Sequence, residues 1–119
     1  MPVRSLGSSV LRWPDRDAVD RAARVFGTEV AGADDRVVRV GYFGSYAKGD
    51  WGVGSDVDLV LILESSDEPF ERRPPGYDLG RLPVPADLFV YTAAEWGRMS
   101  EEGGLPKTAG HEMVWVFER

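Results

Sequence analysis

The sequence predicts a small α/β or α+β sheet domain. Apolar residues recur at helical spacing near the start of the chain, and three later segments are rich in the β-branched and aromatic residues typical of strands. A capping sequence then opens a further helix after the third of these segments. Because 119 residues suffice for one hydrophobic core, residues 1–119 are expected to form a single domain.

The first helix is expected over residues 15–31. Asp15 is a suitable N-cap, and the apolar residues that follow it recur at helical spacing as far as Val30. Gly32 is expected to lie close to the end of this helix, since glycine commonly follows the last helical residue.

Strands are expected over residues 36–43, 57–63 and 84–91. The second segment, VDLVLIL, is almost continuously apolar, which is typical of a central strand covered on both faces. In the third segment, Pro85 indicates either the start of the strand or an edge position, because proline cannot donate a hydrogen bond to a neighbouring strand.

The remaining segments connect and close this framework. Residues 65–83 are rich in Pro, Arg, Glu, Asp and Gly, which predicts a long, mobile connection with room for one helical turn. The capping box in residues 92–95 (TAAE) opens a short helix, which Gly103-Gly104 is expected to end. Residues 111–118 are expected to form a final strand or a short helix.

Composition excludes several classes of protein. The net charge of −6 argues against direct nucleic-acid binding, which depends on neutralising phosphates; the basic residues are dispersed, and the adjacent Arg72 and Arg73 are interpreted as solvated charge. Without cysteine there is no disulfide, thiol catalysis or cysteine zinc site. No apolar run approaches the ~20 residues of a membrane span, and a cytoplasmic location is expected. An acidic balance is consistent with a protein partner or a cation-dependent site.

The most informative stretch surrounds Asp58, which interrupts the apolar segment 57–63. Residues i and i+2 of a strand share a face, so Asp56 and Asp58 are expected to project side by side. Two adjacent carboxylates repel each other and lose hydration on burial, and a divalent cation such as magnesium offsets both effects. Asp87 also interrupts an apolar segment, and a neighbouring strand would bring it beside Asp58 as a third carboxylate.

A turn suited to phosphate precedes these carboxylates. Gly44 and Ser45 directly follow the first predicted strand, and a helix starting at Ser45 would point free N–H groups outward from the sheet. GSYAKG, residues 44–49, has the glycine spacing of a P-loop, but Asp50-Trp51 replaces the required Lys-Ser/Thr. The dinucleotide-binding glycine pattern fails as well, because the third glycine does not lie at the required spacing.

Residues 44–59, GSYAKGDWGVGSDVDL, resemble the motif Gly-Ser-x-x-x-Gly followed by Ser-Asp-x-Asp-Leu of the DNA polymerase β-like nucleotidyltransferase superfamily. The resemblance extends over residues 36–91 and implies that superfamily's fold, a small mixed β-sheet with helices packed mainly on one face. The short chain is most similar to the minimal nucleotidyltransferases, which act as antitoxins beside a helical HEPN toxin. Lys48 is a mild departure, because arginine is common at its position.

The resemblance implies roles for particular residues. Gly44, Ser45 and Ser55 would bind the nucleoside triphosphate. The metal-linked and catalytic carboxylates would be Asp56, Asp58 and Asp87, holding two magnesium ions, with Asp87 activating the acceptor hydroxyl. ATP would be the substrate and a tyrosine of the HEPN-type toxin the acceptor of AMP. Self-association and a complex with the toxin are both open.

Two other functions remain as alternatives. A non-catalytic binding module could neutralise its partner by complex formation alone, and nucleotidyl transfer could instead modify a small molecule or an RNA end. Other conspicuous residues are assigned ordinary roles: His111 to the surface or packing, and Trp51 to packing at the rim of the site rather than to contact with a base. Tyr46 could lie beside the nucleotide or cover the sheet.

Overall fold

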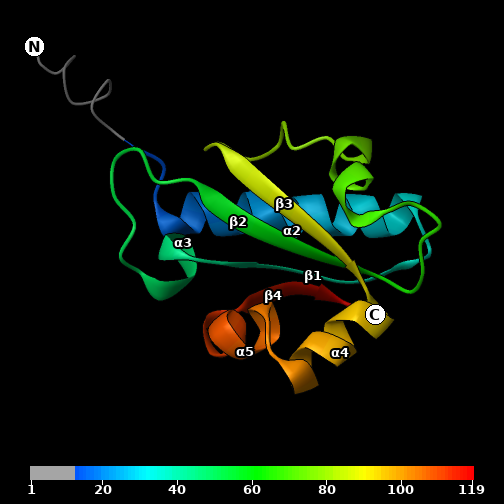
Figure 1. Cartoon of the computed structure of the whole chain (residues 1–119). Coiled ribbons are helices and arrows are strands. Elements are labelled where there is room, and N and C mark those ends of the chain that lie inside the picture. Colours follow the sequence, from blue (N-terminus) through cyan, green and yellow to red (C-terminus); the bar gives the residue numbers. More distant parts are fainter. Residues whose placement is uncertain (1–12) are drawn as a thin grey trace, which may run out of the picture.

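The computed structural model describes residues 13–119 and contains one four-stranded sheet with helix α2 across one face (Figure 1). No helix in this part of the chain is long and apolar enough to cross a membrane. The elements, in chain order, are α2 (Arg16–Ala33), β1 (Val37–Phe43), α3 (Ser45–Lys48), β2 (Val57–Leu63), the 3-10 turns η1 (Phe70–Arg72) and η2 (Pro74–Gly76), β3 (Ala86–Thr92), α4 (Ala93–Glu102), α5 (Leu105–Ala109), the 3-10 turn η3 (Gly110–Glu112) and β4 (Val114–Glu118).

The sheet is mixed, in the order β3-β2-β1-β4. Strand β1 is antiparallel to both β2 and β4, whereas β2 and β3 are parallel. The central position of β2 confirms the prediction from its apolar sequence, and its bounds are those predicted. Strand β3 is an edge strand that begins directly after Pro85, so both interpretations of that proline hold.

Helix α2 covers the face of the sheet that carries the main hydrophobic core. The Asp15 carboxylate accepts a hydrogen bond from the N–H of Ala18 at 2.9 Å, which confirms the predicted N-cap. The buried residues Val19 and Phe26 belong to the same core as the apolar residues of β2. The helix ends at Ala33, one residue past Gly32, which confirms the predicted position of its C-terminus.

Two faces of the sheet differ in their cover. The α2 side carries the main core, including Val57, Leu59, Leu61 and Leu63 of β2. On the opposite face, helix α4 reaches only part of the sheet, where Trp96 contacts aromatic side chains of β3 and β4. The end of that face nearest to the start of β2 and β3 is where the predicted carboxylates lie.

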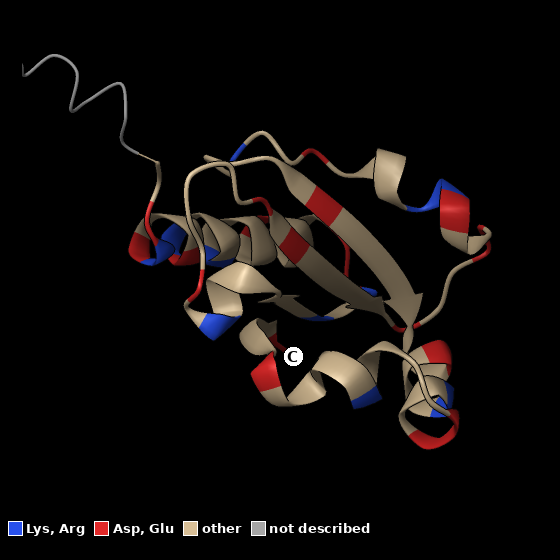
Figure 2. Ribbon diagram, turned by 60° about the vertical axis from the view of Figure 1, so that its left-hand side comes forward, with Lys and Arg blue, Asp and Glu red and all other residues tan. Residues whose placement is uncertain are grey.

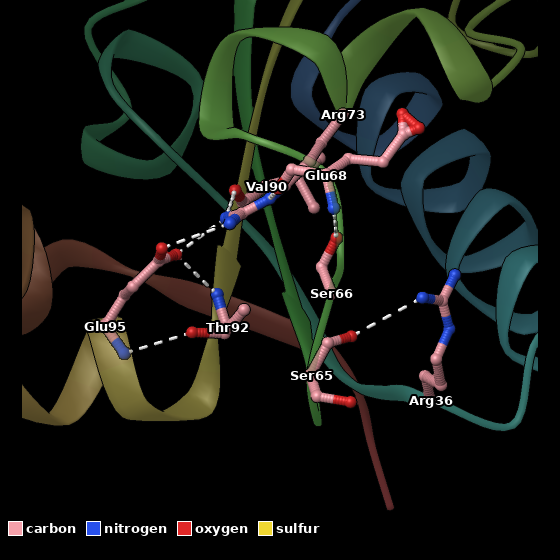
Figure 3. Close-up of polar contacts among 8 residues, drawn as sticks. All are labelled: Arg36, Ser65, Ser66, Glu68, Arg73, Val90, Thr92 and Glu95. Carbon is pink, nitrogen blue, oxygen red and sulfur yellow. Dashed lines mark hydrogen bonds and ion pairs between the residues drawn. The ribbon is translucent and has the colours of Figure 1, made fainter.

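Arg73 anchors the connection between β2 and β3, so the prediction that its side chain is solvated is wrong. Arg73 is only 8% exposed, and its guanidinium donates to the carbonyl oxygens of Glu68 and Val90 at 2.9 and 3.1 Å (Figure 3). It also forms an ion pair with Glu95 at 2.6 Å. The connection therefore holds two 3-10 turns, η1 and η2, rather than one helical turn.

The C-terminal part confirms one predicted boundary and adds an element. Thr92 and Glu95 form the predicted capping box of α4, which ends at Gly103. Helix α5 was not predicted, since its short sequence LPKTA has no apolar periodicity. The final segment resolves into the turn η3 followed by strand β4, which pairs with β1.

Candidate active site

Two aspartates face each other on the parallel strands. Asp58, the second residue of β2, is in register with Asp87, the second residue of β3, so their side chains share one face. Phe43, the last residue of β1, pairs with Asp58 from the other side. Figure 2 shows the acidic positions of the two strands side by side. The structure thus confirms the predicted placement of Asp87 beside Asp58.

The turn after β1 lies against this carboxylate pair. Gly44 has φ +88°, a backbone conformation that favours glycine, and a Cβ at this position would lie 2.6 Å from Oδ2 of Asp58. The short helix α3 begins at Ser45, as predicted, and Gly49 follows it in the left-handed conformation. Glycine is therefore required at position 44 by both the backbone conformation and the approach of Asp58.

Aromatic packing fixes the position of α3. Tyr46 is fully buried, and its hydroxyl donates to the carbonyl oxygen of Pro14 at 2.9 Å. Trp51 stacks on the Tyr46 ring with centroids 5.6 Å apart and planes 8° from parallel. This contact confirms Trp51 as a packing residue at the rim of the site, and it assigns Tyr46 to support of the turn.

The loop between α3 and β2 is held by its own hydrogen bonds. The Ser55 hydroxyl oxygen accepts from the N–H of Gly52 at 2.9 Å, and the Ser55 carbonyl accepts from the Trp13 indole N–H at 3.1 Å. Ser55 therefore organises the approach to β2. Asp56 is exposed and precedes β2. The prediction that it shares a strand face with Asp58 is therefore wrong. Nucleotide contacts of Ser45 and Ser55 stay predictions.

The negative charges of Asp56 and Asp87 act on the carboxylate of Asp58. Burial, followed by the negative charges of Asp56 and Asp87, raises the pKa of Asp58 above its ordinary value. Asp56 and Asp87 are thus each close enough to repel the carboxylate of Asp58. No cation among residues 13–119 forms an ion pair with any of them.

The carboxylates at this site are suitable ligands for a divalent cation. Residues 13–119 contain no group of three His, Asp or Glu side chains already gathered closely enough to hold a metal ion. Asp58 and Asp87 nevertheless supply two carboxylates on one face, and hard cations such as magnesium commonly take one or two carboxylates and complete their coordination with water and phosphate. A bound cation would also offset the burial and the repulsion that together raise the pKa of Asp58.

A fourth carboxylate reaches the same turn. Glu112, in η3, accepts a hydrogen bond from the N–H of Gly44 through Oε1 at 3.3 Å. Glu112 is not among the site residues predicted from the sequence, because the contact joins positions 68 residues apart and depends on the pairing of β4 with β1. Its neighbour His111 is exposed, in agreement with the surface role predicted for it.

A separate groove lies between α2 and the connection after β2. Its lining includes Leu63 at the far end of β2, so it is remote from the carboxylate pair at the start of that strand. Arg36 and Arg81 on its rim form ion pairs with Asp34 and Glu29. The carboxylates and the glycine turn, not this groove, form the candidate active site.

Comparisons with known proteins bear on the family and the fold of the chain. The structure is similar to the crystal structure of a Sulfolobus solfataricus protein described as a candidate nucleotidyltransferase, with 20% identity and a TM-score of 0.64; the match covers 87% of this chain and 84% of that chain. No curated protein matches the sequence significantly. The family model described as "Nucleotidyltransferase domain" matches residues 25–116, a range that contains the glycine turn and all four carboxylates. The chain therefore belongs to the nucleotidyltransferase domain family.

Proposed function

We propose that this nucleotidyltransferase moves AMP from ATP to a hydroxyl group of a partner protein, with magnesium as cofactor. The observation that carries the proposal is the register pairing of Asp58 with Asp87 beside the Gly44 turn. The partner that the motif resemblance implies is a HEPN-type toxin, and the acceptor is a tyrosine. We propose that the protein acts as its antitoxin in the cytoplasm.

Each part of the site has a role in this reaction. Gly44 and Ser45 would bind the triphosphate, while Asp56, Asp58 and Asp87 would hold the magnesium ions. When bound, magnesium neutralises the phosphate charge and polarises the phosphorus that is attacked. Ser55 would support nucleotide binding through the loop that it organises.

The transfer step requires a base near the acceptor. The acceptor oxygen attacks the α-phosphorus of ATP and forms a new P–O bond, while the bond to the β-phosphate oxygen breaks and pyrophosphate leaves. The Asp87 carboxylate would accept the hydroxyl proton, since it is exposed whereas Asp58 is half-buried. The products are the AMP-modified partner and pyrophosphate.

A protein acceptor is supported by the sheet face that bears the aspartates. Phe43 and Phe89 lie next to the carboxylate pair with ring centroids 5.9 Å apart. Further along the face, Tyr91, Trp96 and Trp115 form a continuous row of ring contacts at 5.7 Å. These side chains are half-buried, and aromatic residues are enriched in protein interfaces.

The test combines this protein with the protein encoded by the neighbouring gene, ATP and magnesium. Mass spectrometry of the partner should show the added mass of one AMP, located on a tyrosine. The Asp58→Asn variant should give no adduct, and Asp35→Asn, an exposed position before β1, should leave transfer unchanged.

The second candidate is a non-catalytic antitoxin that acts by complex formation. The same experiment separates the two functions. If the wild-type protein blocks toxicity without any AMP adduct, and Asp58→Asn blocks it equally well, the binding module is correct and the enzymatic proposal is wrong. Adducts on a small molecule or an RNA end, with none on the partner, would instead identify a different acceptor.

A further inference from the structure

The hydrogen bond between Gly44 and Glu112 places a negative charge at the phosphate-binding turn, Gly44 and Ser45, that is proposed to bind the triphosphate. Strand β4 pairs with β1 as far as Tyr42 and Val114. Beyond this point η3 interrupts the antiparallel ladder, so the N–H of Gly44 receives a side-chain oxygen of Glu112 rather than a backbone carbonyl. The donor on the turn is thus occupied by a carboxylate from the C-terminal segment.

Two features make this contact easy to exchange. The donor–acceptor distance of 3.3 Å exceeds the 2.7–2.9 Å typical of charge-assisted N–H bonds, so the bond is weak. Within residues 13–119, no Lys or Arg forms an ion pair with Glu112. Nothing in the described structure therefore compensates the charge of Glu112, apart from the backbone donor itself.

The surroundings oppose a further negative charge. The carboxylate of Asp58 also lies close to this turn, because a Cβ added at Gly44 would lie only 2.6 Å from its Oδ2. Phosphate oxygens arriving at this turn would meet Glu112 on the Gly44 donor and Asp58 beside it. Magnesium can neutralise Asp58 and the phosphates, but Glu112 competes directly for the same N–H group.

We infer that Glu112 is a displaceable carboxylate. In the nucleotide-free protein it occupies the N–H of Gly44 in the phosphate-binding turn, and it is released when the triphosphate binds. This inference rests on the proposed function, since it names the residue that sets the affinity of that site for nucleotide. Glu112 competes with the triphosphate for the N–H of Gly44, so its removal strengthens nucleotide affinity. If Glu112 were instead a cation ligand, its removal would weaken that affinity.

The test measures binding of α,β-methylene ATP with magnesium by calorimetry, so that no transfer takes place. Glu112→Ala should bind about three- to tenfold more tightly than the wild-type protein, the effect expected for loss of one competing hydrogen bond and its charge. Glu112→Gln should show a smaller gain, because the amide oxygen still accepts from Gly44. Glu102→Gln, an exposed position in α4, removes the same charge elsewhere and should leave affinity unchanged.

A spectroscopic readout follows the contact itself. In the nucleotide-free protein, Glu112→Ala should shift the Gly44 amide proton resonance upfield, and nucleotide should move that resonance in the wild-type protein away from its free position. Equal or weaker binding by Glu112→Ala, with the fold intact, overturns the inference and leaves the proposed function standing. Absence of nucleotide binding by both proteins overturns the proposed function together with the inference.

Discussion

Asp58 and Asp87 lie directly opposite each other on two parallel strands, and no basic side chain among residues 13–119 pairs with either one. Like charges in this arrangement destabilise a sheet, so the pair is unfavourable for folding unless a cation binds between the carboxylates. The same burial that shapes the core of β2 raises the pKa of Asp58 and increases this unfavourable effect.

Replacing Asp58 with asparagine should separate activity from stability. Transfer of AMP should fall by about 10²-fold or more, because a charged group that acts on the transition state is lost. The free energy of unfolding at neutral pH should stay equal or rise by about 0.2–1 kcal/mol, because the like-charge contact with Asp87 is removed.

Transfer assays and thermal unfolding in metal-free buffer measure the two effects, and Asp35→Asn is the control for loss of one exposed carboxylate. A marked loss of stability in Asp58→Asn would show that the carboxylate is structural, and would contradict this prediction.

The pH dependence of stability should carry the signature of a raised pKa. The native state holds the Asp58 proton more tightly than the unfolded chain, whose pKa is near 3.8, so this group makes the protein less stable as the pH rises through its native pKa. The Tm of Asp58→Asn minus that of the wild type should therefore be small near pH 3 and grow until Asp58 is ionised. A constant difference over this range would refute the assignment.

Magnesium should reverse this difference. Binding to the native state alone stabilises a protein by mass action, so millimolar Mg²⁺ with a nucleotide analogue should raise the Tm of the wild-type protein. Asp58→Asn and Asp87→Asn should show a much smaller rise, and excess chelator should abolish it in the wild type. If all three proteins respond equally, the cation binds elsewhere.

Two glycine substitutions should distinguish backbone strain from steric conflict. Gly44 and Gly49 both have positive φ, but an added Cβ at Gly49 meets nothing within 4 Å, whereas at Gly44 it meets Asp58. Gly49→Ala should destabilise the protein by about 1–2 kcal/mol from the left-handed backbone alone. Gly44→Ala should cost more and also lower nucleotide affinity, as chemical denaturation and calorimetry would measure; equal effects in both variants would argue against close contact with Asp58.

The adjacent arginines Arg72 and Arg73 should behave very differently. Arg73→Ala leaves Glu95 and the Val90 carbonyl without their guanidinium partner, and should destabilise the protein by about 1–3 kcal/mol. Arg72→Ala removes an exposed side chain and should change stability by no more than about 0.5 kcal/mol. Similar denaturation midpoints for the two variants would contradict the anchoring role of Arg73.

Local sequence patterns were sufficient for much of the fold. The apolar run of β2, the N-cap Asp15 and the capping box at Thr92 each act within a few residues, so their signals are readable without knowledge of the rest of the chain. The motif around Gly44 and Asp58 indicated the candidate active site for the same reason, since its two halves are close in sequence.

Features that depend on contacts between residues distant in the sequence were harder to predict. The burial of Arg73 depends on Glu95 and on a carbonyl of β3, 17 residues away, and composition alone indicated only a polar connection. The contact of Glu112 with Gly44 arises because β4 joins the sheet beside β1, an arrangement that the sequence pattern does not specify. Helix α5 is too short to show periodicity.

The anchoring of the β2–β3 connection also affects how the protein behaves among other copies of itself. Strand β3 ends the sheet on one side, and an uncovered strand edge is a template onto which another chain can add. The guanidinium of Arg73 occupies the Val90 carbonyl in the middle of that strand. It therefore interrupts the row of acceptors that an incoming strand would need in order to pair with the strand that carries Asp87.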